Sequence, residues 1–297
     1  MEYVIETNNL TKKFPNKLAV DHVNIHVQKG DIYGLIGRNG AGKTTIMKMI
    51  LGITFPTEGE MSLFGEQELD KQRRRIGSLI EAPGIYRGCT AFENMKRFSL
   101  LYGGTDEEIN ELLEFVGLAN TGTMKAGNFS LGMKQRLGLA LSLLGKPEIL
   151  ILDEPVNGLD PAGIKEFRDI ILKLNKEKGV TFVVSSHLLD ELGKIATRYG
   201  ILNDGKLVDE ISAEELQERC KTCLIIKTDD NEKAAEVLTK AKLMDKHLVS
   251  KDKLSMYDHF EDPSLINETL VKAGLKVYQL SFSGNGFEDY FIERLGK

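Results

Sequence analysis

The sequence predicts an α/β fold with a parallel-sheet core, and three observations support this prediction. Residues 37–44 fit the phosphate-loop pattern G-x-x-x-x-G-K-[ST], which connects a strand to a helix. An apolar run at 32–36 precedes that loop, and residues 45–51 after it place apolar side chains on one helical face. A second, wholly apolar run at 149–152 is typical of a strand that is buried on both faces of a parallel sheet.

Length and composition limit the class of protein. The 297-residue chain is long enough for one or two domains, and 41% hydrophobic and 28% charged residues are ordinary for a soluble globular protein. The net charge of −5 offers no basic surplus, so we expect no nucleic-acid partner. No apolar run approaches the roughly eighteen residues of a membrane span. Residues 1–6 lack a basic region followed by an apolar core, so we expect no signal peptide.

The cysteines indicate a reducing compartment. Cys89, Cys220 and Cys223 form no even disulfide framework, which is typical of the cytosol. Cys220 and Cys223 make a single C-x-x-C, and we interpret it as two incidental thiols in preference to a redox or zinc site.

The phosphate loop has the residues that a nucleotide phosphate site requires. Its glycines let backbone N–H groups turn inward, and the N-terminus of the following helix adds positive partial charge. Lys43 is expected to reach the β- and γ-phosphates, and Thr44 to offer its hydroxyl to Mg²⁺. An ordinary glycine-rich turn is the alternative, and the flanking strand and helix disfavour it. The predicted nucleotide-binding residues here are Gly37, Arg38, Asn39, Gly40, Ala41, Gly42, Lys43, Thr44 and Thr45.

The first half of the chain is expected to start with strands and continue with helices. The short strands predicted here are 4–7, 10–14, 23–27 and 59–65. From Arg73 to Gly145 the character changes to helix. Thr105 to Glu108 has the capping-box form that opens a helix, and a further helix is expected at 131–144. We therefore predict a helical insertion at about 84–145 between two parts of the α/β core.

The second half returns to the core and then begins a new unit. The core elements predicted are strands at 149–152 and 181–186, a helix at 161–176 and a hairpin at 200–208. From about Ser212 the order is β-α-β-α-β, with strands at 224–226, 254–257 and 276–280, helices at 232–243 and 263–273, and a closing helix at 287–295. We predict two domains, 1–212 and 213–297, the second being a small α+β domain without an identifiable chemical motif.

Polar side chains follow the two later core strands, at the sheet edge where sites of α/β proteins gather. Asp153 and Glu154 end one strand, and one such carboxylate can hold Mg²⁺ while the second polarises an attacking water. His187 follows the next strand and is placed to reach the same γ-phosphate, although a lone histidine is usually structural. Phe14, beside a proline, is either a core aromatic or a stacking face for an adenine ring.

The order of these motifs resembles the ATP-binding subunit of an ABC transporter over residues 3–212. The stretches that carry the resemblance are the phosphate loop, 129–136, 149–154, Asn157 to Asp160, and His187. The resemblance implies a phosphate-loop NTPase cassette of the ABC type, in which an N-terminal antiparallel β subdomain and a helical insertion accompany the parallel-sheet core. It also implies ATP and Mg²⁺ as cofactors.

The same resemblance implies a head-to-tail homodimer that holds two ATP molecules. Each ATP would lie between the phosphate loop of one copy and the stretch 129–136 of the other, where Ser130 and Gly132 would contact the γ-phosphate. The resemblance also implies that Glu154 is the general base and that Asp153 supports Mg²⁺. It implies that Asp160 bridges the subunits and that His187 senses the γ-phosphate.

Two stretches depart from the family pattern. The stretch that usually reads Leu-Ser-Gly-Gly-Gln is here Phe129-Ser130-Leu131-Gly132-Met133, so the first glycine is lost, and with it part of the backbone donor geometry. Glu81 stands where the family usually has glutamine. An ionised glutamate accepts hydrogen bonds without donating them, and it could bind Mg²⁺ with a full charge. The replacement is similar to that in the bacitracin-resistance and lantibiotic-immunity group, and a chance replacement is the alternative.

We therefore expect a cytosolic ATPase subunit, peripheral at the cytoplasmic face of the membrane, that drives a separately encoded permease and exports peptide antibiotics. The insertion and the Glu81 loop would contact that permease. The alternatives are a soluble ABC ATPase acting on ribosomes or DNA, a phosphate-loop GTPase, and a regulator built on the C-terminal unit. A single phosphate loop without sustained heptads disfavours the first. Asn175 to Lys178 lacks the final aspartate of the guanine-reading Asn-Lys-x-Asp motif, which disfavours the second.

Overall fold

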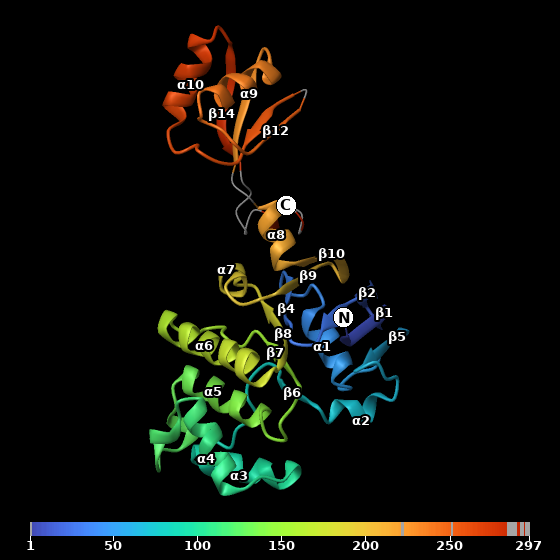
Figure 1. The fold of residues 1–297 in the computed structure, drawn as a ribbon. Coiled ribbons are helices and arrows are strands. Elements are labelled where there is room, and N and C mark those ends of the chain that lie inside the picture. Colours follow the sequence, from blue (N-terminus) through green and yellow to red (C-terminus); the bar gives the residue numbers. More distant parts are fainter. Residues whose placement is uncertain (1, 221–222, 251, 284–289, 292–293, 295–297) are drawn as a thin grey trace. The chain divides into compact units, whose positions relative to one another are not determined.

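The apolar runs become the central strands of a mixed sheet in the computed structural model of the chain (Figure 1). In the described residues this sheet has the order β10-β9-β4-β8-β7-β6, and only β10 runs antiparallel to its neighbour. The central strands β4, β7 and β8 are buried along their whole length, as predicted for strands covered on both faces. The strands of this sheet are β4 (Ile32–Gly37), β6 (Ile76–Leu79), β7 (Ile149–Asp153), β8 (Thr181–Ser186), β9 (Arg198–Asn203) and β10 (Lys206–Ser212).

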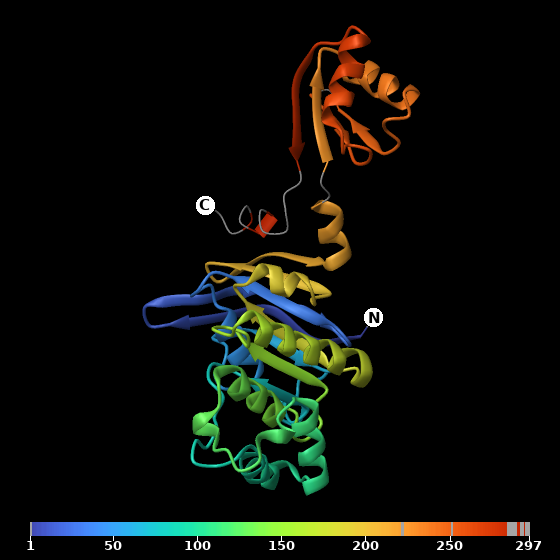
Figure 2. The same ribbon diagram turned by 90° about the vertical axis from the view of Figure 1, so that its left-hand side faces the viewer.

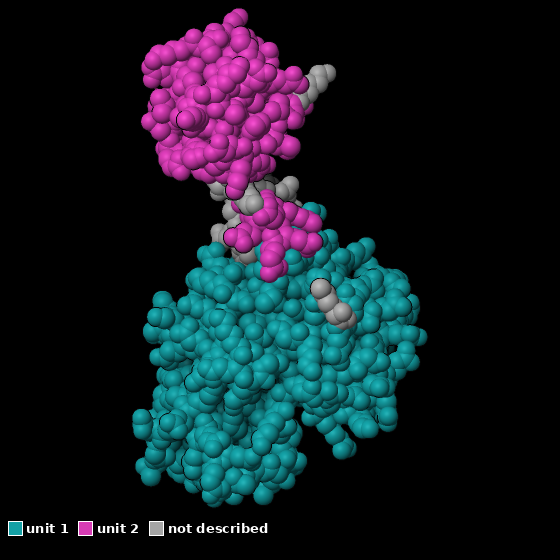
Figure 3. Space-filling model, in the orientation of Figure 1, with its two compact units in different colours: residues 1–213, 294–297 teal, residues 214–293 magenta. Residues whose placement is uncertain are grey.

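The structure describes residues 2–220, 223–250, 252–283, 290–291 and 294. These belong to two compact units, which are coloured separately in Figure 3. The first comprises residues 1–213 and 294–297, and the second comprises residues 214–293. No helix in the described ranges combines the length and the apolar character needed to cross a membrane.

A second sheet, antiparallel, covers the helix that follows the phosphate loop. Its strands are β1 (Tyr3–Phe14), β2 (Lys17–Val23), β3 (His26–Gln28) and β5 (Glu58–Leu63). Helix α1 (Lys43–Ile50) buries Ile46 and Met49 in one apolar cluster with side chains from both sheets, so it is packed between them (Figure 2). The predicted break between strands 4–7 and 10–14 was wrong. A shift in register near Asn9, which has φ +50°, interrupts the pairing of one continuous strand.

The helical insertion forms a separate cluster of buried apolar side chains. Both α3 and α4 begin with a reciprocal capping box, and the one at Thr105 was predicted. The prediction that helical character begins at Arg73 was wrong, because β6 is an edge strand of the core sheet. Its Gly77 lets α5 pass close: a Cβ there would lie 2.1 Å from the Ser142 carbonyl oxygen. The helices of the first unit beyond α1 are α2 (Leu69–Arg73), α3 (Ala91–Tyr102), α4 (Asp106–Phe115), α5 (Leu131–Ser142), α6 (Pro161–Lys178) and α7 (Leu189–Gly193), with short 3₁₀ turns at Ala119–Thr121 and Ala126–Asn128.

The second unit has the order β-α-β-β-α-β after a short helix, α8 (Ala213–Arg219). Its antiparallel sheet runs β12-β13-β11-β14, the arrangement of the ferredoxin-like fold, with α9 and α10 packed over one apolar face. The predicted order lacked β12, because a three-residue run is too short to be recognised as a strand from the sequence. The predicted closing helix at 287–295 lies largely outside the described residues. The elements are β11 (Cys223–Thr228), α9 (Asn231–Lys240), β12 (His247–Val249), β13 (Leu254–Met256), α10 (Pro263–Lys272) and β14 (Val277–Ser283).

Candidate active site

The phosphate loop connects the end of β4 to the start of α1, as predicted from the flanking patterns. Gly42 immediately precedes the helix with φ +110°, and a Cβ at this position would lie 2.5 Å from the carbonyl oxygen of Ala19. Gly40 has φ +83°. Both positions therefore favour glycine, and the backbone can turn its N–H groups toward an anion at the helix N-terminus.

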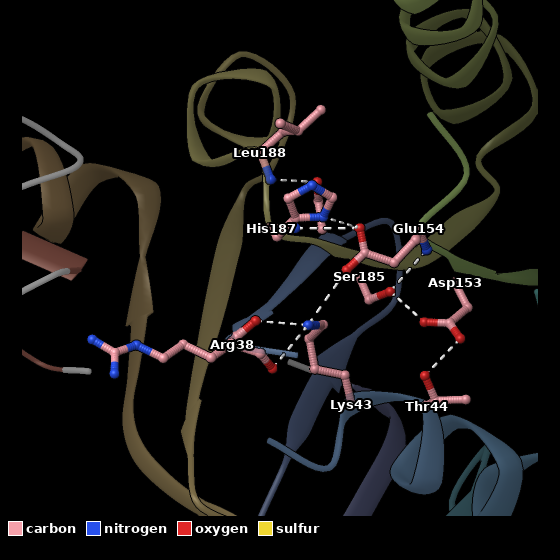
Figure 4. Close-up of polar contacts among 10 residues, drawn as sticks. Arg38, Lys43, Thr44, Asp153, Glu154, Ser185, His187 and Leu188 are labelled. Carbon is pink, nitrogen blue, oxygen red and sulfur yellow. Dashed lines mark hydrogen bonds and ion pairs between the residues drawn. The ribbon is translucent and has the colours of Figure 1, made fainter. Parts of the chain in front are cut away.

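Lys43 lies over this loop with its side chain almost fully buried (Figure 4). Its Nζ donates to the Gly37 carbonyl oxygen at 2.6 Å and lies 3.4 Å from Oε1 of Glu154. The ammonium thus connects the loop to the carboxyl end of β7.

Asp153 is held between two hydroxyl groups (Figure 4). Thr44 Oγ1 donates to one carboxylate oxygen at 2.7 Å, and Ser185 Oγ donates to the other at 2.6 Å. Ser185 also accepts from the backbone N–H of Glu154 at 2.9 Å. These contacts follow from the sheet, because Asp153 and Ser185 are direct partners in the parallel register of β7 and β8. Our reading of the sequence missed Ser185. Its signal was a polar residue that ends an otherwise apolar strand.

Glu154 is bound from two sides. Its Oε2 lies 2.7 Å from His187 Nδ1 and accepts from the His187 backbone N–H at 3.3 Å. Its Oε1 is buried and has no hydrogen-bond partner in the described part of the chain, so the Lys43 ammonium is its charged neighbour. The backbone of Glu154 has φ +48°, in the left-handed region that a non-glycine residue rarely adopts.

Residues of the phosphate loop and Glu154 line a cavity of about 270 Å³ together with Phe14 and Lys17. The Phe14 ring is 42% exposed, and Lys12 Nζ lies 5.2 Å from its centroid. Lys17 Nζ donates to the Gly40 carbonyl oxygen at 2.9 Å, so a second ammonium group lies at the phosphate loop. Lys17 was not among the residues predicted for this site. A larger cavity of about 840 Å³ lies between the helical insertion and the amino ends of β7 and β8, and none of the predicted site residues lines it.

Known proteins are similar to this chain in sequence and in fold. Residues 20–157 match the family described as "ABC transporter". The "Bacitracin transport ATP-binding protein BcrA" of Enterococcus faecalis is 41% identical over 300 residues, covering 100% of this chain and 97% of the relative. The chain belongs to the ABC transporter family. It is an ATP-binding cassette protein that hydrolyses ATP in a reaction coupled to transport.

Two further relatives show how far the cassette extends. The "Lantibiotic transport ATP-binding protein SrtF" of Streptococcus pyogenes is 42% identical over 207 residues, which cover 70% of this chain and 90% of the relative. A dimeric post-hydrolysis structure of the ATP-binding cassette MJ0796 with ADP and Pi is 27% identical, covers 70% of this chain and 98% of that chain, and has a TM-score of 0.64. The likeness to BcrA therefore extends beyond the cassette to the C-terminal unit.

Of the predicted ATP-binding residues outside the phosphate loop, three do not line its cavity. Ser130 and Asp160 are exposed N-caps of α5 and α6, accepting from the backbone N–H groups of Met133 at 3.2 Å and Gly163 at 3.0 Å. Gly132 lies near this pair of caps, since a Cβ on it would meet Leu159 at 3.8 Å. The stretches 129–136 and 157–160 thus form one surface of the cassette, away from the chain's own phosphate loop.

Glu81 forms its ion pair with Lys48 of α1, whereas Asp153 is bound by Thr44 of the same helix. Glu81 Oε1 accepts from Lys48 Nζ at 2.7 Å, and the Glu81 side chain is 66% exposed. The hydrogen bond and charge of Lys48 lower the pKa of the Glu81 carboxyl below its usual value.

Proposed function

We propose that this ABC ATPase powers a separately encoded membrane permease that exports peptide antibiotics of the bacitracin or lantibiotic type. The observation that carries this proposal is the likeness to BcrA over the whole chain, including the C-terminal unit. The likeness of the cassette to SrtF and the glutamate at position 81 also support it. The subunit would then work as a peripheral protein at the cytoplasmic face of the membrane, with the helical insertion and the Glu81 loop as the permease contact.

ATP would bind along the cavity from Phe14 to the start of α1. The exposed ring of Phe14 offers a stacking surface for adenine, while residues 37–45 and Lys43 surround the phosphates. Thr44 and Asp153, already within 2.7 Å of each other, provide the hard oxygen ligands that suit Mg²⁺, and Glu81 would add a third. Bound Mg²⁺ would neutralise charge on the β- and γ-phosphates.

Glu154 is the general base in this proposal, and its contacts explain why ATP is needed to release it. Lys43 lies between the phosphate loop and Glu154 Oε1. When phosphate oxygens take over the Lys43 ammonium, Oε1 becomes free to accept a proton from water. His187 Nδ1, 2.7 Å from Oε2, would hold the carboxylate in place and sense the γ-phosphate.

Completion of the site would require a second copy of the chain. Ser130, Gly132 and Asp160 lie on a surface apart from the chain's own cavity, with donors at the N-terminus of α5. We infer that this surface covers the γ-phosphate in a head-to-tail partner. The dimeric state of the MJ0796 cassette supports this inference.

Glu154→Gln tests the catalytic assignment. We expect Mg²⁺-ATP hydrolysis by the purified chain to fall at least about a hundredfold, because the amide cannot accept the proton, while ATP stabilises a dimer on size-exclusion chromatography. The exposed Glu177→Gln on α6 should leave both properties unchanged. Unchanged turnover in Glu154→Gln would remove Glu154 from this role, and a chain that stays monomeric with ATP would contradict the shared site. The export proposal is tested separately, by bacitracin and lantibiotic resistance of cells that express the chain with its permease.

A further inference from the structure

Lys48 and Glu81 form an ion pair beside the proposed magnesium site. Lys48 Nζ lies 2.7 Å from Glu81 Oε1. Lys48 follows Thr44 by four residues on α1, so the two side chains lie on the same face of the helix, about one turn apart. Thr44 in turn contacts Asp153. One helix face therefore carries both the hydroxyl proposed to bind Mg²⁺ and the cation that holds Glu81.

Glu81 reaches this face from the sheet. Strands β6 and β7 are parallel neighbours in which Leu79 pairs with Leu152, so Glu81 and Glu154 each stand two residues beyond a paired position. Adjacent strands are about 4.8 Å apart, which puts both carboxylates at the same sheet edge. Both have left-handed backbones, with φ +61° and +48°. Such backbones are uncommon for non-glycine residues and gather at functional sites.

We propose that Lys48 is a positioning residue that holds the Glu81 carboxylate away from the metal site until Mg²⁺ and nucleotide bind. The inference rests on the proposed function, because it takes Glu81 as a magnesium ligand. A glutamate can alternate between an ammonium and a divalent cation in this way, since both compete for the same negative oxygens. A glutamine at this position carries no charge for which they could compete.

The exposure of the pair makes it suitable for such an exchange. The Lys48 and Glu81 side chains are 33% and 66% exposed, so the pair is weak and a divalent ion can displace the ammonium. The energies typical of exposed pairs correspond to about a two- to fivefold change in affinity. Mg²⁺ is expected to strengthen nucleotide binding to a certain extent in the unaltered chain. Without Lys48, we expect this strengthening to be about two- to fivefold larger.

The experiment measures equilibrium binding of a fluorescent ATP analogue to the full chain, once with excess EDTA and once with saturating Mg²⁺. The quantity compared is the dissociation constant with EDTA divided by the dissociation constant with Mg²⁺. This ratio cancels any general effect of the lost positive charge on nucleotide binding. We expect Lys48→Gln to raise this ratio about two- to fivefold. Lys48→Met serves as a second variant if the glutamine variant does not fold.

Matched variants separate positioning from a structural role. Lys48→Arg keeps the charge and should retain the ratio of the unaltered chain, as should Lys71→Gln, which removes an exposed charge on α2. In a Glu81→Gln background, the Lys48 substitution should leave the ratio unchanged, because no carboxylate remains to be released. A merely structural Lys48 would instead shift thermal stability and leave the ratio the same in both backgrounds.

The outcomes distinguish this inference from the proposed function. If the folded Lys48→Gln chain has an unchanged or lowered ratio, the positioning role is overturned and the nucleotide site stands. The role is also overturned if the increase persists in the Glu81→Gln background. If the unaltered chain binds the analogue no better with Mg²⁺ than with EDTA, the proposed magnesium site itself fails.

Discussion

Replacing Ser185 by alanine should destabilise the cassette far more than replacing its neighbour Ser186. Both serines are buried on β8, and their side chains point to opposite faces of the sheet. Ser185 Oγ donates to the Asp153 carboxylate and accepts from the Glu154 backbone N–H, at 2.6 and 2.9 Å. Ser186 Oγ accepts a single bond, from the Leu188 backbone N–H at 2.9 Å.

The contacts set the expected magnitudes. A hydrogen bond to a charged group contributes about 1.5–3 kcal/mol, and a buried backbone N–H left without a partner costs about 1–3 kcal/mol. We therefore expect Ser185→Ala to lower the free energy of unfolding by about 3 kcal/mol and Ser186→Ala by about 1 kcal/mol. For a unit of this size, 1 kcal/mol shifts Tm by about 2–4 °C, so the expected decreases are about 6–12 °C and about 2–4 °C.

Differential scanning calorimetry of the full chain measures these shifts. The transition of the first unit is identified as the one that moves upward when ATP is added, since ligand binding stabilises the folded state. Ser185→Ala should also weaken Mg²⁺-dependent ATP binding, because Asp153 loses the bond that orients it toward Thr44. Equal Tm decreases for the two variants would refute the assignment of Ser185 as the support of Asp153.

Two further predictions concern charge. Lys17→Met should raise the dissociation constant for ATP about three- to tenfold by calorimetric titration, because an ammonium lining the cavity is lost, whereas the exposed Lys13→Met on the paired strand should have no effect. An unchanged constant for Lys17→Met would exclude a phosphate contact. Burial and the nearby Glu210 raise the pKa of Tyr33 well above its ordinary value of about 10. The unfolded chain then loses this proton first, so stability is retained below about pH 10 and lost above it, and Tyr33→Phe should flatten the decline of the urea midpoint between pH 9 and 11. If the urea midpoints of the unaltered chain and of Tyr33→Phe decline in parallel with pH, ionisation of Tyr33 is not the cause of the decline.

Most of the local structure could be predicted from residues near one another in the chain. The phosphate loop, the strand and helix beside it and the capping box at Thr105 depend on backbone geometry and short-range hydrogen bonds, which a short stretch specifies. The predictions missed two short strands, for which the local sequence pattern is weak. The strands β6 and β12 are only four and three residues long, so their formation depends on pairing with a neighbouring strand.

The amino-acid sequence alone determined the family, the phosphate loop and the residue types available for chemistry, since these depend on identity and order. Only the tertiary structure decided which of those residues meet. Thr44 and Asp153 are 109 positions apart and share a hydrogen bond because α1 packs beside β7, and Ser185 supports Asp153 because β8 is the partner of β7 in the sheet. The same packing pairs Glu81 with Lys48. Such contacts arise from the folding of distant segments onto one core, and no short pattern in the sequence encodes them.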